Sequence, residues 1–224
     1  MSLLRRKRDE PDAGGADAAP ADAVEQPSTD DLWPAEEKSR PEGPFDVDDV
    51  DDDLTRIDFG ALRIPAVDGM EIRLDVDDEG RVGAVAVVLA GTALQLQVFA
   101  APRTLTIWDE IRAEMLAGIT ETGGKAQETV GPFGPELVAQ LPVDGGDGKP
   151  TVQPVRFLGV DGPRWFLRGV VTGPGGVDVD AAGDVHHLFR NVVVVRGDSA
   201  APPREPLLLT MPEDPALQPD EGAP

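Results

Sequence analysis

At 224 residues the chain can hold one ordinary domain with tails, and its formal net charge of −22 makes it strongly acidic. Phosphate backbones would repel such a chain, so nucleic-acid binding is not expected. The absence of cysteine excludes disulfides, thiolate chemistry and cysteine-ligated metals, and it fits a reducing, cytoplasmic location.

The N-terminal quarter of the chain has the composition of a disordered tail. Residues 5–8 are basic but have no apolar stretch behind them, so neither a secretory signal nor a membrane span is expected. Residues 9–53 hold 17 acidic and 2 basic side chains. Such a segment cannot bury enough apolar surface to offset the entropy lost on ordering, so we expect disorder over residues 1–53. Its aromatic islands at Trp33 and Phe45 could dock on a partner, or one of them could pack on the folded domain.

Residues 57–195 alternate between sheet and helix patterns. Strands with period-two or uninterrupted apolar patterns are expected at residues 57–64, 70–76, 82–89 and 94–98. Residues 106–122 have helical spacing, with Thr106 as the expected N-cap. Further elements are expected as a strand at 125–130, a short helix or turn at 135–141, a short helix over 180–190 and a buried strand over 192–195.

A hairpin is the clearest signal in the second half of the chain. Strand-like residues 152–160 and 163–171 flank the Asp-Gly dipeptide at 161–162, which favours a type I′ turn. This register would place Phe157 opposite Phe166.

These elements predict an α+β fold with a largely antiparallel sheet packed against two or three helices. Residues 54–198 are expected to form a single domain, and residues 199–224 a disordered tail rich in proline and alanine.

The folded unit has few groups for catalysis. It contains no serine, cysteine or tyrosine, so no Ser or Cys nucleophile can be paired with a base there, and we assign no catalytic residue. His186 and His187 are neighbours on a short helix and point about 100° apart, which is unsuited to holding one metal ion. We therefore expect no metal site and no cofactor.

Arginine is the polar feature that remains. The hairpin arginines could form a site for an anion or an acidic peptide, or they could pair with nearby carboxylates. The candidate binding residues are those of the hairpin and the two aromatic islands: Arg156, Arg164, Trp165, Arg168, Trp33 and Phe45. Our interpretation is a non-enzymatic cytoplasmic domain, adaptor-like or chaperone-like, that binds a protein partner. The alternative is a small-molecule or anion-binding protein, or an enzyme, that uses Arg164 or Arg168 with His186 or His187 and carboxylates.

Several motifs add a resemblance. They are Gly43-Pro44-Phe45-Asp46, Asp58-Phe59-Gly60-Ala61-Leu62-Arg63-Ile64-Pro65, Trp108-Asp109-Glu110-Ile111-Arg112, Gly162-Pro163-Arg164-Trp165-Phe166-Leu167-Arg168-Gly169 and Val192-Val193-Val194-Val195-Arg196-Gly197. On these motifs the chain resembles an actinobacterial family of unknown function over about residues 43–198. The resemblance implies no activity, cofactor or catalytic residue. The order of strands and helices is also similar to secretion-chaperone-like α+β domains, which bind peptides.

Overall fold

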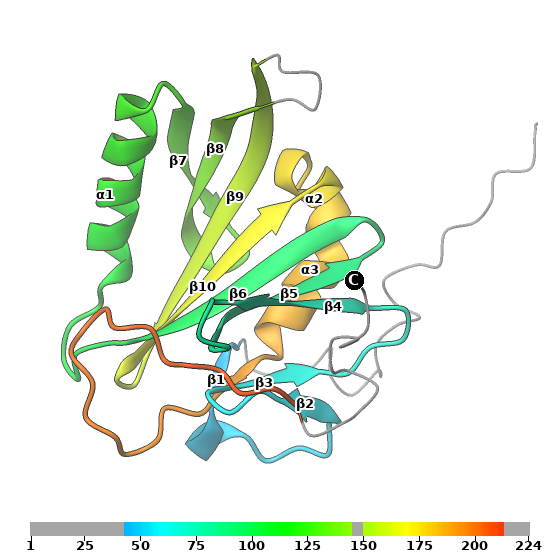
Figure 1. Cartoon of the computed structure of the whole chain (residues 1–224), viewed down its shortest axis with the longest axis vertical. Coiled ribbons are helices and arrows are strands. Elements are labelled where there is room, and N and C mark those ends of the chain that lie inside the picture. Colours follow the sequence, from blue (N-terminus) through cyan, green and yellow to red (C-terminus); the bar gives the residue numbers. More distant parts are fainter. Residues whose placement is uncertain (1–42, 145–149, 213–224) are drawn as a thin grey trace, which may run out of the picture.

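The computed structural model describes residues 43–144 and 150–212, and Figure 1 shows the arrangement of their elements. The larger of two sheets is antiparallel throughout, in the order β4-β5-β6-β10-β9-β8-β7. Its strands are β4 (Glu71–Val76), β5 (Val82–Leu89), β6 (Thr92–Ala100), β7 (Lys125–Gly131), β8 (Gly134–Asp144), β9 (Pro150–Gly162) and β10 (Trp165–Thr172).

A smaller sheet has the order β1-β11-β3-β2, with β1 parallel to β11 and the other pairs antiparallel. Its strands are β1 (Phe45–Asp46), β2 (Arg56–Asp58), β3 (Leu62–Pro65) and β11 (Val193–Val194). The single strand expected at residues 57–64 is therefore wrong, because the chain reverses at Gly60 (φ 77°) and pairs β2 with β3. Phe45 belongs to this sheet, whereas Trp33 lies outside the described residues.

Three α-helices of the described residues accompany the sheets: α1 (Trp108–Glu121), α2 (Pro174–Val177) and α3 (Gly183–Arg190). Short 3₁₀ turns cover Val47–Asp49 and Asp180–Ala182. The expected α+β class with a largely antiparallel sheet is confirmed.

Residues 135–141, expected as a helix or turn, belong instead to β8. Leu137 and Ala139 are buried there while Val138 and Gln140 are less so, which is the period-two pattern of a strand. Pairing with β7 on one side and β9 on the other supplies the hydrogen bonds that hold β8 extended.

The larger sheet separates two apolar clusters. On one face, α3 and the smaller sheet cover a cluster that includes Leu96, Leu158 and Phe189. On the other face, α1 packs over β7, β8 and β9 and covers Leu137 and Phe157. Figure 1 shows α1 standing at one end of the sheet and α3 behind its middle strands, so each helix covers a different part of a different face.

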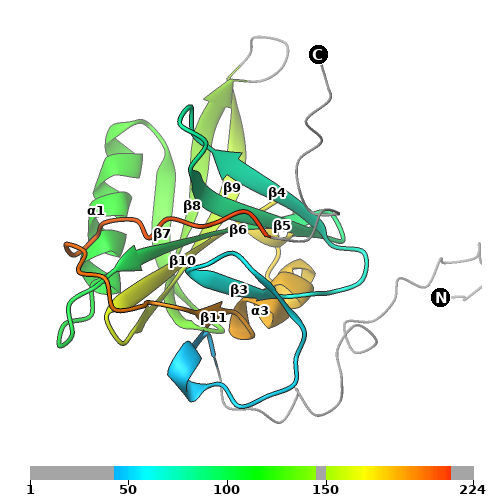
Figure 2. The same cartoon turned by 60° about the horizontal axis from the view of Figure 1, so that its bottom comes forward.

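A C-terminal segment joins the two sheets. The backbone N–H of Leu207 donates to Val98 of β6, that of Leu209 to Val82 of β5, and that of Thr210 to Phe59. Figure 2 shows this orange-to-red segment running from the side of α1 toward β5. Backbone pairing therefore extends beyond residues 54–198 in both directions, through β1 before residue 54 and through this segment after residue 198. None of the helices in the described ranges has the length and apolar character needed to cross a membrane.

Candidate functional site

The β9–β10 hairpin turns two residues later than its Asp-Gly dipeptide predicts. Trp165 pairs with Gly162 and Phe166 with Asp161, so Pro163 and Arg164 form the turn, and the predicted pairing of Phe166 with Phe157 is wrong. Arg164 has a left-handed backbone (φ 64°), and proline followed by such a residue fits the central positions of a type II turn. Asp161 and Gly162 stay within β9.

This register sends the three hairpin arginines in different directions. Arg156 lies on the same face as Leu158, toward α3. Arg168 lies on the opposite face, with its guanidinium 5.4 Å from the ring centroid of Phe99. Arg164 is in the turn itself. The sequence grouped these arginines as one candidate site, but the structure does not bring them together.

Arg156 belongs to a buried polar cluster. It forms an ion pair with Glu136 of β8, and these side chains are only 9% and 3% exposed. His186 of α3 is 7% exposed, and its ring lies edge-on to Phe133. Burial, together with the charges of Arg156 and Arg190, lowers the pKa of His186 to about 4. The imidazole is therefore neutral at pH 7 and is a weak base there.

The cluster is incompletely bonded. Glu136 Oε2, Arg156 Nε and His186 Nε2 are buried without a hydrogen-bond partner in the described part of the chain. Burial raises the pKa of the Glu136 carboxyl, while the charge of Arg156 acts in the opposite direction. Within residues 43–144 and 150–212, no group of three or more His, Asp or Glu side chains is arranged to hold a metal ion.

A second set of polar residues lies on a half-exposed sheet surface. We define the open face as the side of β4, β5, β6 and β10 that carries Arg73, Ala86, Gln95, Gln97 and Arg168. None of these five side chains is fully buried, because α1 packs on β7, β8 and β9 instead. Figure 1 shows no helix in front of β4, β5 and β6.

Arg168 is the arginine of this face that lacks an oppositely charged neighbour among the described residues. Its guanidinium donates a hydrogen bond to Gln97 Oε1 and stacks on Phe99, but its Nε is buried without a partner. Burial lowers the pKa of the guanidinium, although an arginine stays charged at neutral pH. No carboxylate of the described residues forms an ion pair with it, whereas Arg73 on the same face is paired with Glu71.

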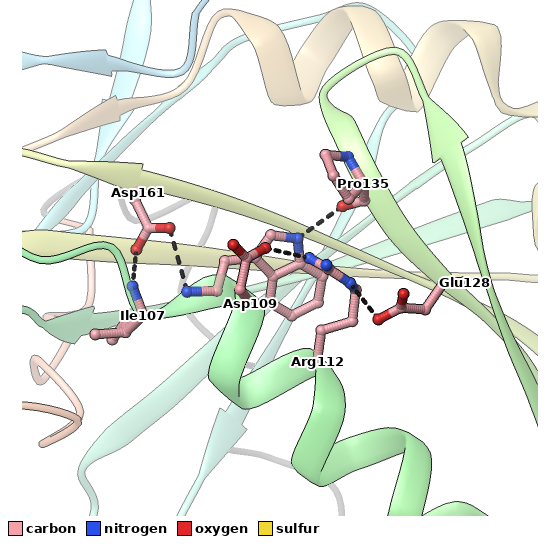
Figure 3. Close-up of polar contacts among 7 residues, drawn as sticks. Ile107, Asp109, Arg112, Glu128, Pro135 and Asp161 are labelled. Carbon is pink, nitrogen blue, oxygen red and sulfur yellow. Dashed lines mark hydrogen bonds and ion pairs between the residues drawn. The ribbon is translucent and has the colours of Figure 1, made fainter.

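Contacts at the start of α1 explain why the helix leaves this face open (Figure 3). Asp161 of β9 accepts hydrogen bonds from the backbone N–H groups of Ile107 (2.9 Å) and Trp108 (3.2 Å). The Trp108 indole donates to the carbonyl of Pro135 (2.7 Å), and Arg112 lies 5.6 Å from its ring centroid. These bonds anchor α1 over β8 and β9, away from β4, β5 and β6.

The helix begins at Trp108, so the expected N-cap at Thr106 is wrong. The residue before the helix, Ile107, has no side chain that can cap, and Asp161 supplies the acceptors from another element. A carboxylate at a helix N-terminus also interacts favourably with the helix dipole.

Trp165 and Phe45 lie on the opposite side of the hairpin from Arg168. Trp165 is buried, and its indole donates a 2.7 Å hydrogen bond to Asp46 of β1. Phe45 is half-buried beside it on β1. The sequence did not identify Gln97, Asp46 or Glu136 as site residues. Of the three, only Glu136 has a recognisable signal of a buried polar residue, because it is a charged residue among apolar ones at strand spacing.

Comparison with known proteins supplies a family. A family model described as "Protein of unknown function (DUF3710)" matches residues 43–218. The chain belongs to this family. No curated protein and no solved structure matches the chain. The DUF3710 match begins at residue 43, among the residues that lead into β1, and it brings no activity or ligand. The expected actinobacterial origin stays a prediction.

Proposed function

We propose that this DUF3710 chain is a non-enzymatic, cytoplasmic protein-interaction domain. In this proposal the open face receives an extended segment of a partner protein that carries an acidic side chain. The domain would act as an adaptor or chaperone, by binding and not by catalysis. The carrying observation is Arg168, a half-buried guanidinium on an open sheet face with no carboxylate partner among the described residues.

The environment of Arg168 suits an acidic partner. A guanidinium that has lost part of its hydration gains most from a carboxylate, which can accept two parallel hydrogen bonds. Gln97 and Phe99 already hold the side chain in place, so little additional ordering is needed on binding. A partner carboxylate at this point would supply the missing opposite charge.

The surroundings of Arg168 suit an extended chain. Ala86 lies opposite Gln95 on β5, so the surface is low on the β5 side of the arginine, whereas the Trp108 ring covers Gly159 on the β9 side. The amides of Gln95 and Gln97 can donate to and accept from a backbone laid across them. A peptide could therefore lie on the sheet with one acidic side chain at Arg168.

The scarcity of catalytic groups supports binding over catalysis. Residues 54–198 contain no serine or cysteine. His186 is buried and has a low pKa, and it lies on the α3 side of the sheet, away from Arg168. The same cysteine-free composition supports the cytoplasmic location.

The test compares two arginines of the same face. The tagged full-length chain, Arg168→Gln and Arg73→Gln would be purified from cells of the native host, and the bound proteins identified by mass spectrometry. We expect one reproducible partner with the wild type and with Arg73→Gln, because Arg73 is already paired with Glu71.

The purified partner should bind Arg168→Gln about tenfold more weakly or worse, the loss expected for a charge-assisted hydrogen bond. Unfolding curves would establish that both variants are folded. Equal binding by Arg168→Gln, or no reproducible partner for the wild type, would contradict the proposal.

A further inference from the structure

A cleft lies beside the β9–β10 turn, on the opposite side of the hairpin from Arg168, and it is separate from the open face. Its cavity has a volume of about 440 Å³, and an adjoining cavity of about 370 Å³ shares Asp46, Asp49 and Pro163 with it. These volumes fall in the range of roughly 300–1,000 Å³ that is typical of small-ligand pockets. We name this the turn cleft. Its walls come from three segments of the chain: residues 46–49, the turn at Pro163 and Arg164, and residues 195–198.

One wall of the turn cleft carries two arginines without acidic partners. Arg164 donates to the carbonyl of Gly197 (3.2 Å), and Arg196 donates to the carbonyls of Arg164 (3.0 Å) and Ser199 (2.9 Å). In the part of the chain that the structure describes, neither arginine forms an ion pair. This is unexpected in a chain with 42 acidic and 20 basic side chains.

Contacts with other segments of the chain hold Arg164 in its position. Its φ of 64° is uncommon for a residue other than glycine and is energetically unfavourable. Its carbonyl accepts hydrogen bonds from both the backbone of Ala101 and the side chain of Arg196. Contacts from two other segments therefore hold this turn in place beside the cleft.

The facing wall is acidic. Asp46 is occupied, since it accepts hydrogen bonds from the Trp165 indole and from the backbone N–H of Asp48. The side chains of Asp48 and Asp49 are exposed and form no ion pair with another described residue. Asp198 also lines the cavity.

The charges on the two walls restrict the ligand. Four aspartates and two arginines give the lining a formal charge of −2, so a multiply charged anion such as phosphate would be repelled overall. A simple cation would be attracted to the aspartates but would leave both arginines unpaired. A molecule with an anionic and a cationic group would satisfy both walls at once.

We propose that the turn cleft binds a small zwitterion that carries a carboxylate and an ammonium group, either a free amino acid or a short peptide. The carboxylate lies against Arg164 and Arg196, and the ammonium group against Asp48 and Asp49. This site is independent of the open face and of the acidic partner proposed for Arg168.

The Trp165 indole provides a reporter inside the site. Its N–H is bonded to Asp46, which lines both cavities, and Trp165 lines the smaller one. The chain has three tryptophans, so Trp33→Phe and Trp108→Phe together assign the three indole signals in a ¹⁵N–¹H spectrum of the full-length chain. The probes would be glycine, leucine, diglycine and triglycine, with acetate and methylamine as the carboxylate-only and ammonium-only analogues.

We expect at least one zwitterion to shift the Trp165 indole signal in a saturable way, and to do so more strongly than acetate, methylamine or their mixture. Binding by glycine or leucine would identify the source as free amino acids. Binding by diglycine or triglycine alone would identify it as peptides.

A matched pair of variants tests the arginine wall. Arg164→Asn removes the guanidinium while asparagine tolerates the left-handed backbone. Arg204→Asn is the control: Arg204 has a φ of 68°, and it pairs with Glu110 and Glu114 outside the cleft. We expect binding to weaken about tenfold or more in Arg164→Asn and in Arg196→Gln, and to stay unchanged in Arg204→Asn.

Asp49→Asn tests the acidic wall and should also weaken the binding of zwitterions. The proposal is overturned if no zwitterion gives a saturable shift at millimolar concentration, or if acetate or methylamine alone binds as well. It is also overturned if Arg164→Asn and Arg196→Gln bind like the wild type.

Discussion

The indole N–H of Trp165 donates a 2.7 Å hydrogen bond to the carboxylate of Asp46, which lies 119 residues earlier in the chain. Both residues are buried. The bond joins the first strand of the smaller sheet to the hairpin of the larger one, and it fixes one side of the turn cleft.

Asp46→Ala should lower the free energy of unfolding by about 1–3 kcal/mol, because it leaves the buried indole N–H without an acceptor. Asp46→Asn keeps a carbonyl oxygen at the same place and should cost less. Urea denaturation of the three proteins checks this expectation. Equal stability of the alanine variant and the wild type would show that water replaces the lost acceptor.

The Glu136–Arg156 ion pair predicts a difference between single and double variants. Arg156→Met leaves a buried carboxylate without its partner and should cost about 3–5 kcal/mol. Replacing both residues, with Glu136→Leu and Arg156→Met, should recover most of that loss because no unpaired charge remains. Denaturation of the two single variants and of the double variant gives the coupling energy between Glu136 and Arg156. A double variant less stable than both singles would contradict this account.

His186 predicts how stability changes with pH. Its pKa is about 4 in the folded protein against 6.5 as a free side chain, so the unfolded chain binds a proton more tightly. The stabilisation is therefore complete above pH 6.5 and is lost as the pH falls toward 4, by about 3 kcal/mol in all.

His186→Gln should remove this part of the pH dependence, and His187→Gln should keep it. The measurement is the free energy of unfolding at several pH values between 4 and 7, relative to the wild type. Taking the difference between proteins cancels the titration of the carboxylates that all of them share. Parallel curves for His186→Gln and the wild type would refute the low pKa.

Asp161 predicts a local effect on α1. Asp161→Ala removes the acceptor for the N–H groups of Ile107 and Trp108 and should destabilise the protein by about 1 kcal/mol. Hydrogen exchange should become faster in the first turn of α1 before it does so in the sheet. Thr106→Ala is the control, and its effect should stay within about 0.5 kcal/mol because Thr106 is exposed and precedes the helix.

Local patterns predicted the elements that have one strong periodicity. The uncharged run at residues 82–89 coincides with β5, and the helical spacing at 106–122 contains α1. Both signals arise within a few neighbouring residues, where strand and helix geometry alone decide which side chains share a face.

The predictions that failed depended on distant residues. The turn does not form at the Asp-Gly dipeptide, because Asp161 instead caps α1 and the ring of Trp165 lies against Gly162. A Cβ at Gly162 would lie 2.1 Å from that ring, so glycine is needed there for packing and not for the turn. Neither contact is visible in the sequence around the dipeptide.

The acidic balance, the lack of Ser and Cys nucleophiles in the domain and the alternation typical of an antiparallel sheet can all be recognised from the amino-acid sequence. Which charges are paired follows instead from how the strands and turns come together in the folded chain. Arg156 meets Glu136, whereas Arg164, Arg168 and Arg196 meet no carboxylate among the described residues. The reason is that an ion pair depends on the register between strands and on which face each residue occupies, and a turn displaced by two residues changes the cross-strand partners of every residue in the hairpin.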